Sequence, residues 1–188
     1  KQKKEEGEAY ISTVLFDDKV EILHDRVSLD AVKPMTDKEY YVRGCTALLD
    51  AVGDAIHHIG NVHKYARDED RPEKILFIIT TDGQENSSRK YSYERVQHMV
   101  KRQQERFGWE FLFLGANIDA VCEAGKFGIR ADRAVNYECD RVGTEINYQV
   151  LSRAVSRIRA CESASAMQEA LVGWDEEIRD DYANRHMK

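Results

Sequence analysis

Short apolar runs alternate with amphipathic helical stretches along most of this chain, and this alternation constrains its fold more than any other feature. The run Ile75–Ile79 is followed by two threonines, Asp82 and Gly83, and a second, largely apolar run spans Trp109–Leu114. Runs of this kind are typical of strands that are covered on both faces. Because strands separated by helices pair in parallel, the sequence predicts an α/β domain.

The expected elements follow from apolar spacing and from turn residues. The first two strands should form a hairpin around Asp17–Lys19, with Gly108 and Gly128 as helix stops and Asp119 as an N-cap. We expect strands at Ala9–Phe16, Val20–Leu23, Ile75–Thr80, Trp109–Leu114 and Ala134–Tyr137. We expect helices at Thr46–Val62, Tyr93–Arg106, Ala120–Phe127, Thr144–Cys161 and Met167–Tyr182.

Composition narrows the class of protein. A chain of 188 residues that is 42% hydrophobic can bury about 70% of its unfolded surface in one domain. Its net charge of -6 argues against a nucleic-acid surface. The four cysteines are widely spaced, which indicates free thiols in a reducing cytoplasm, and no apolar run approaches the length of a membrane span. We therefore expect a cytoplasmic protein that binds neither nucleic acid nor membrane.

Asp82 stands where a buried parallel strand ends, and ligands of open α/β sheets bind beyond the carboxyl ends of strands. The chain has no glycine-rich phosphate-binding motif, so a nucleotide site is poorly supported. The loops offer oxygen ligands instead, from Thr46, Asp82, Gln84, Glu85 and Asn86. Oxygen ligands suit a hard cation such as Mg²⁺.

Two motifs in order, Gly44-Cys-Thr46-Ala-Leu-Leu-Asp-Ala51 and Ile78-Ile-Thr-Thr-Asp82-Gly83, give the chain a resemblance to the von Willebrand factor A (VWA) family. The resemblance runs from about Ala9 to about Ile158 and is nearest to small stand-alone bacterial members, which have a stretch similar to Trp109–Asp119. It implies a Rossmann-like, three-layer α/β/α fold over residues 1–160, with a mostly parallel sheet and one antiparallel edge strand. Residues 161–188 would be an acidic helical extension packed on that domain.

The resemblance also implies a metal-ion-dependent adhesion site. Thr46 would be the hydroxyl ligand of its second loop and Asp82 the carboxylate of its third, holding Mg²⁺ or Mn²⁺ directly or through water. A partner protein would complete the metal sphere with its own carboxylate, so the chain would be a binding module and not an enzyme. The rim that contacts the partner would consist of Gly44, Cys45, Gly83, Gln84, Glu85 and Asn86.

One part of the family pattern is missing. The first-loop motif D-x-S-x-S does not occur, since Asp25-Arg-Val-Ser28 has the wrong spacing and follows the wrong element. We expect that the chain lacks the natural N-terminal segment that would carry this loop and a central strand. The open sheet position makes strand exchange between chains, or another homo-oligomer, conceivable.

Several alternatives compete with the metal site. Asp82 could be a turn residue and Thr46 only a helix cap, in a metal-free scaffold whose site is vestigial. A metal-assisted phosphoester hydrolase is a third possibility, although no acid–base pair is evident. His57, His58 and His63 lack the spacing of a zinc helix and are interpreted as surface residues.

Overall fold

The computed structural model describes residues 2–36 and 44–186, and the chain divides into two compact units. Unit 1 comprises Lys1–Tyr65 with Glu85–Ser92, and unit 2 comprises Ala66–Gln84 with Tyr93–Lys188. The strands are β1 (Tyr10–Phe16), β2 (Val20–Ser28), β3 (Leu76–Thr81), β4 (Glu110–Gly115) and β5 (Ala134–Asn136). The α-helices are α1 (Leu48–Tyr65), α2 (Tyr93–Phe107), α3 (Ala120–Lys126), α4 (Arg141–Arg159), α5 (Met167–Ala170) and α6 (Glu176–His186). Single 3-10 turns are η1 (Gln2–Lys4), η2 (Leu29–Ala31), η3 (Asp68–Asp70), η4 (Ala131–Arg133) and η5 (Ala164–Ala166).

Unit 1 consists of an antiparallel hairpin and one long helix. β1 and β2 pair across the expected turn, where the Lys19 N–H donates to Asp17 Oδ1 at 2.7 Å. β2 continues beyond Leu23 to Ser28, and the pairing shifts register on either side of Thr13. The buried side chains of α1 lie in its first half, so this helix is anchored mainly at its N-terminal end.

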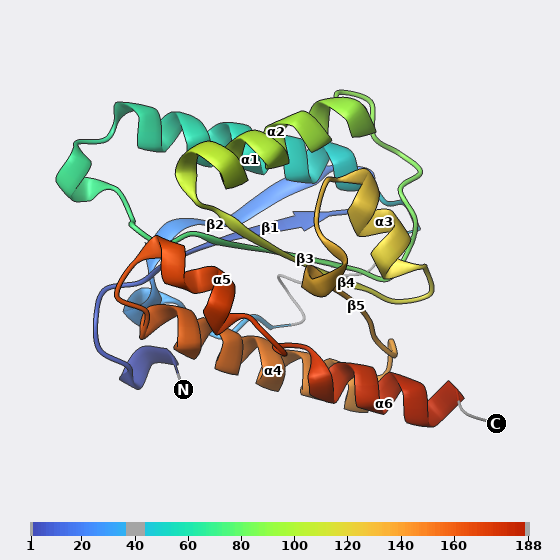
Figure 1. Ribbon diagram of the computed structural model, residues 1–188. Coiled ribbons are helices and arrows are strands. Elements are labelled where there is room, and N and C mark those ends of the chain that lie inside the picture. The colour runs from blue at the N-terminus through green and yellow to red at the C-terminus, as the bar shows by residue number, and fades with distance from the viewer. Residues whose placement is uncertain (1, 37–43, 187–188) are drawn as a thin grey trace. The chain divides into compact units, whose positions relative to one another are not determined.

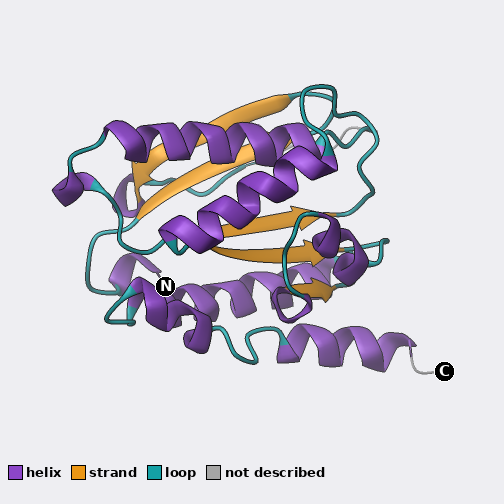
Figure 2. Ribbon diagram, turned by 45° about the horizontal axis from the view of Figure 1, so that its top comes forward, coloured by secondary structure: helices purple, strands orange, loops and turns teal. Residues whose placement is uncertain are grey.

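Unit 2 contains a parallel sheet in the order β3-β4-β5. Figure 2 shows its three strands side by side and pointing the same way, as the alternation of strands and helices predicts. All six residues of β4 are buried, because both faces of this central strand are covered. Helices α2 and α3 lie on one face of the sheet and α4, α5 and α6 on the other (Figure 1). Unit 2 is therefore an α/β/α arrangement.

The sheet organisation differs from the single mixed sheet that the resemblance implies. The described strands form two separate sheets, a two-stranded antiparallel one and a three-stranded parallel one. A single sheet would need a strand that hydrogen-bonds to members of both, and none of the described strands does so. The predicted α/β class is nevertheless confirmed, because helices alternate with the parallel strands β3, β4 and β5.

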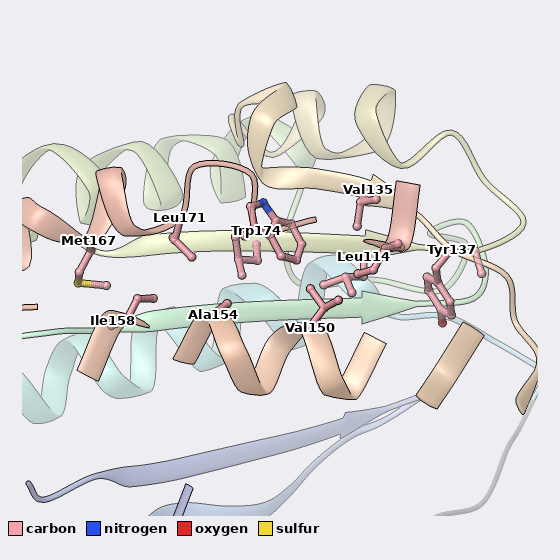
Figure 3. Packing of buried hydrophobic residues seen from close by; sticks show 12 residues of the cluster. Leu114, Val135, Tyr137, Val150, Ala154, Ile158, Met167, Leu171 and Trp174 are labelled. Carbon is pink, nitrogen blue, oxygen red and sulfur yellow. The ribbon is translucent and has the colours of Figure 1, made fainter. Parts of the chain in front are cut away.

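Leu112 and Leu114 of β4 belong to a buried hydrophobic cluster of unit 2. Figure 3 shows side chains of α4 and of the C-terminal segment converging on these strands. The members on α4 and the C-terminal segment are Val150, Ala154, Ile158, Met167, Leu171, Trp174 and Ile178. On the opposite face, Phe113 contacts Phe127 with ring centroids 5.9 Å apart. The alternating side chains of β4 thus fill two different layers.

The C-terminal segment packs as expected, because Leu171, Trp174 and Ile178 are all buried. Trp174 Nε1 also donates to the Asp132 carbonyl oxygen at 3.1 Å. The four cysteines are free thiols, as predicted. Within the described ranges, no helix has the length and apolar character needed to cross a membrane.

Several local predictions are confirmed at the ends of helices. α2 and α3 are followed by Gly108 and Gly128, which have positive φ angles of 65° and 77°. Glycine adopts this left-handed conformation without a steric penalty, so both act as helix stops. Asp119 is the N-cap of α3, where its Oδ1 accepts the Cys122 N–H at 2.9 Å.

Candidate functional site

In unit 2, the loops that follow the three parallel strands all leave from one edge of the sheet. Asp82 comes directly after β3, Asn117 lies in the turn after β4, and Cys139 lies in the loop after β5. This is the carboxyl edge, at which ligands of open parallel sheets bind. The sequence prediction thus places Asp82 correctly at the end of its strand.

The carboxylate of Asp82 is exposed and makes no hydrogen bond to any described residue. The turn is held instead by Thr81, whose hydroxyl donates to the Gly83 carbonyl oxygen at 2.9 Å. Asn117 Nδ2 donates to the main-chain oxygen of Asp82, at 3.3 Å. Because neighbouring groups fix the turn, the Asp82 side chain has no evident structural role, and the turn-residue alternative is weakened.

Cys139 lies within the electrostatic influence of Asp82. Burial of the thiol raises the pKa of Cys139, and the negative charge of Asp82 raises it further. A hydrogen bond with Tyr137 acts in the opposite direction without reversing the shift. The surroundings of Cys139 therefore favour its thiol over its thiolate.

In unit 1, Thr46 lies two residues before α1 and is bound through its backbone to Asn86. The Thr46 N–H donates to Asn86 Oδ1 at 2.9 Å, and the Asn86 N–H donates to the Thr46 carbonyl oxygen at 3.0 Å. The Thr46 hydroxyl makes no hydrogen bond to any described residue. The helix-cap alternative for Thr46 is therefore not supported, because its side chain does not cap α1.

The cap of α1 is supplied by the segment Glu85–Ser92, which we call the clasp. Glu85 Oε2 accepts the Leu49 N–H at 2.8 Å, and Ser88 Oγ accepts the Asp50 N–H at 3.0 Å. Glu85 also orders the clasp itself, accepting the N–H groups of Ser87 and Ser88 at 2.8 and 2.7 Å. Two of the N–H groups in the first turn of α1 are thus satisfied by side chains of the clasp.

Asp50 fastens the other half of the clasp to α1. Its carboxylate accepts the backbone N–H groups of Arg89, Lys90 and Tyr91 at 2.9, 2.9 and 3.0 Å. Burial opposes ionisation of Asp50, but these N–H groups outweigh it and hold its pKa below the usual range. This role was not predicted from the sequence. The available signal was a carboxylate, Asp50, among apolar residues of a buried helical stripe.

The rim residues predicted from the sequence divide into two kinds. Gly44, Cys45 and Gln84 are exposed and Gly83 is half-buried, and the Cys45 and Gln84 side chains make no hydrogen bond to described residues of the clasp. Glu85 and Asn86, by contrast, use their side-chain oxygens to build the clasp.

Of the three histidines interpreted as surface residues, His57 is exposed, as predicted, and His58 and His63 are partly buried. His57 is exposed and contacts Asn61, and half-exposed His58 contacts Asp25 Oδ1 at 3.0 Å. Throughout the part of the chain that the structure describes, no three His, Cys, Asp or Glu residues are grouped so as to hold a metal ion.

Comparison of this chain with protein-family models, with curated proteins and with solved structures gives no match.

Proposed function

We propose that this chain is a binding module of VWA type that uses Mg²⁺ or Mn²⁺ to recognise a carboxylate on a partner protein. Asp82 supplies a carboxylate ligand, and the resemblance in sequence assigns Thr46 the hydroxyl ligand. The module has no catalytic turnover.

One observation carries the proposal. The side-chain oxygens of Asp50, Glu85, Asn86 and Ser88 accept backbone N–H groups, whereas the Thr46 hydroxyl in unit 1 and the Asp82 carboxylate in unit 2 make no hydrogen bond to any described residue. Polar side chains that the fold does not use are candidates for binding.

The chemistry of these two oxygens fits a hard cation. Hydroxyl and carboxylate ligands suit Mg²⁺ and Mn²⁺, and Mg²⁺ commonly keeps several waters while it is held by one or two carboxylates. A bound cation with exchangeable waters would attract an anionic group, which accounts for the choice of a carboxylate on the partner.

The first test is the thermal unfolding midpoint of the full chain in EDTA and across Mn²⁺ and Mg²⁺ titrations. A ligand that binds only the folded state, at a hundred times its Kd, should raise the midpoint of a chain of this size by roughly 5–10 °C. We expect this rise for the wild type and its loss in Asp82→Ala and Thr46→Val.

The matched control is Asp180→Ala, which removes an exposed carboxylate from α6 and should keep the full rise. A wild-type midpoint that does not respond to either cation contradicts the proposal. Partner binding that persists in EDTA would favour the metal-free scaffold. Phosphate release from generic phosphoesters that is lost in Asp82→Ala would favour the hydrolase.

A further inference from the structure

Asn86 of the clasp forms hydrogen bonds with both backbone polar groups of Thr46. Thr46 and Asn86 are 40 positions apart in the chain, and they exchange two hydrogen bonds that engage both the N–H and the C=O of Thr46. The neighbouring Ala47 N–H donates to the Asp17 carbonyl oxygen. The backbone that carries the Thr46 hydroxyl is therefore fixed, while the hydroxyl makes no hydrogen bond to any residue that the structure describes.

Asn86 is held in place by the rest of the clasp. Glu85 orders the residues that follow Asn86, and Asp50 ties Arg89, Lys90 and Tyr91 to α1. All of these contacts are made between protein groups, so the clasp is complete in the absence of a cation. A loop that is already ordered loses little conformational entropy when its ligand binds.

The acceptor capacity of Asn86 is already used. Its Oδ1 accepts the Thr46 N–H and also the Ser87 hydroxyl, which donates to it at 2.9 Å. An amide oxygen has two lone pairs, so this atom has none left for a cation or for a donor on a partner. The Asn86 oxygen is therefore not available as a metal ligand.

We propose that Asn86 is a positioning residue, which presents the Thr46 hydroxyl in its binding geometry before a cation arrives. The inference rests on the proposed function, in which Thr46 is a metal ligand. Groups that orient a metal ligand without touching the metal commonly contribute about 10- to 100-fold to metal affinity.

The test compares Mn²⁺ affinity among full-length variants, measured by titration calorimetry at a temperature where each is folded. Asn86→Ala removes the acceptor for Thr46 and should weaken Mn²⁺ binding roughly 10- to 100-fold. Asn86→Asp keeps an oxygen in the same place and should restore the wild-type affinity or exceed it. Ser87→Ala removes only the second bond to the same oxygen, so it should bind Mn²⁺ like the wild type.

Hydrogen exchange gives a readout that does not depend on metal. The Thr46 amide should exchange faster in Asn86→Ala than in the wild type and in Asn86→Asp, because its acceptor is lost. If the wild type binds Mn²⁺ and folded Asn86→Ala binds it equally well, the positioning role is refuted while the proposed function stands. If the wild type binds no Mn²⁺, both are refuted.

Discussion

At the scale of a single residue, the carboxylate of Asp50 attaches the clasp to α1. It lies in the first turn of α1, is buried, and accepts three consecutive N–H groups from a segment about 40 positions away. Carboxylates that accept several backbone N–H groups are strongly held in the ionised form. The attachment of the clasp to α1 therefore depends on a charge that acid removes.

Asp50 should make stability depend on pH at the acid end. Its folded pKa lies below the unfolded value of about 3.9, so its contribution is fully present above about pH 4 and is lost as the pH falls through the folded pKa. We expect the free energy of unfolding of Asp50→Asn to fall less steeply than that of the wild type below pH 4, as measured by urea denaturation. Parallel curves for the two proteins would contradict this account.

At the scale of an element, the first half of α1 must accommodate an aromatic ring of the clasp. Gly53 lies in this half, and a Cβ at that position would come within 2.6–2.7 Å of the Tyr91 ring. The close atoms include the ring carbon nearest the Tyr91 backbone, which cannot move far without displacing the clasp. The glycine is therefore a packing requirement, and helix propensity alone would favour alanine by about 1 kcal/mol.

We expect Gly53→Ala to destabilise the protein by about 1–3 kcal/mol, because overpacking outweighs the gain in propensity. The matched control is Gly125→Ala in α3, where a Cβ would meet nothing within 4 Å. That change should leave stability equal or improved. Chemical denaturation of both variants measures the difference, and an equal effect in the two would refute the role of Tyr91.

Much of the element order could be predicted from the sequence, because the helices and parallel strands bury regular apolar patterns. The strand ending at Ser28 was predicted too short, since residues such as His24 and Arg26 lie in a half-exposed hairpin where no apolar alternation is required. α4 begins at Arg141 and not at Thr144, because Asp140 caps it by accepting the Gly143 N–H at 2.7 Å.

The site was predictable only in part, because only some of its residues adjoin segments with a regular apolar pattern. Asp82 follows a recognisable strand, so its place at the carboxyl edge could be deduced. The clasp has no periodicity, and its conformation depends on bonds between Glu85 or Asn86 and groups 36 to 40 positions away. Side chains that were expected to face a partner are therefore used internally, and no local pattern indicates this.

At the scale of the whole molecule, the order of the chain does not follow its division into units. Residues 85–92 belong to unit 1, while the residues on both sides of this segment belong to unit 2. Along the sequence, the first part of unit 1 ends at Tyr65, and its second part, residues 85–92, follows β3 of unit 2. Unit 1 is discontinuous, so its folding should depend on the complete chain.

A fragment of residues 1–65 should not fold independently. It lacks the clasp that satisfies the N-terminal N–H groups of α1, and isolated helices and two-stranded hairpins are marginal in water. We expect its circular dichroism to show little helix and no cooperative thermal transition, in contrast to the full chain. A cooperative transition in the fragment would show that the clasp is dispensable.

The neighbourhood of Cys139 has a consequence for chemical labelling. A thiol reacts with alkylating reagents as its thiolate, and the pKa of Cys139 is raised by burial and then by Asp82, so we expect Asp82 to slow the modification of Cys139 at neutral pH. Replacing Asp82 by asparagine should therefore speed alkylation of the peptide that contains Cys139, with Cys122 as an internal standard. The rate at which Cys139 is alkylated, followed by mass spectrometry, would thus report on the charge at position 82.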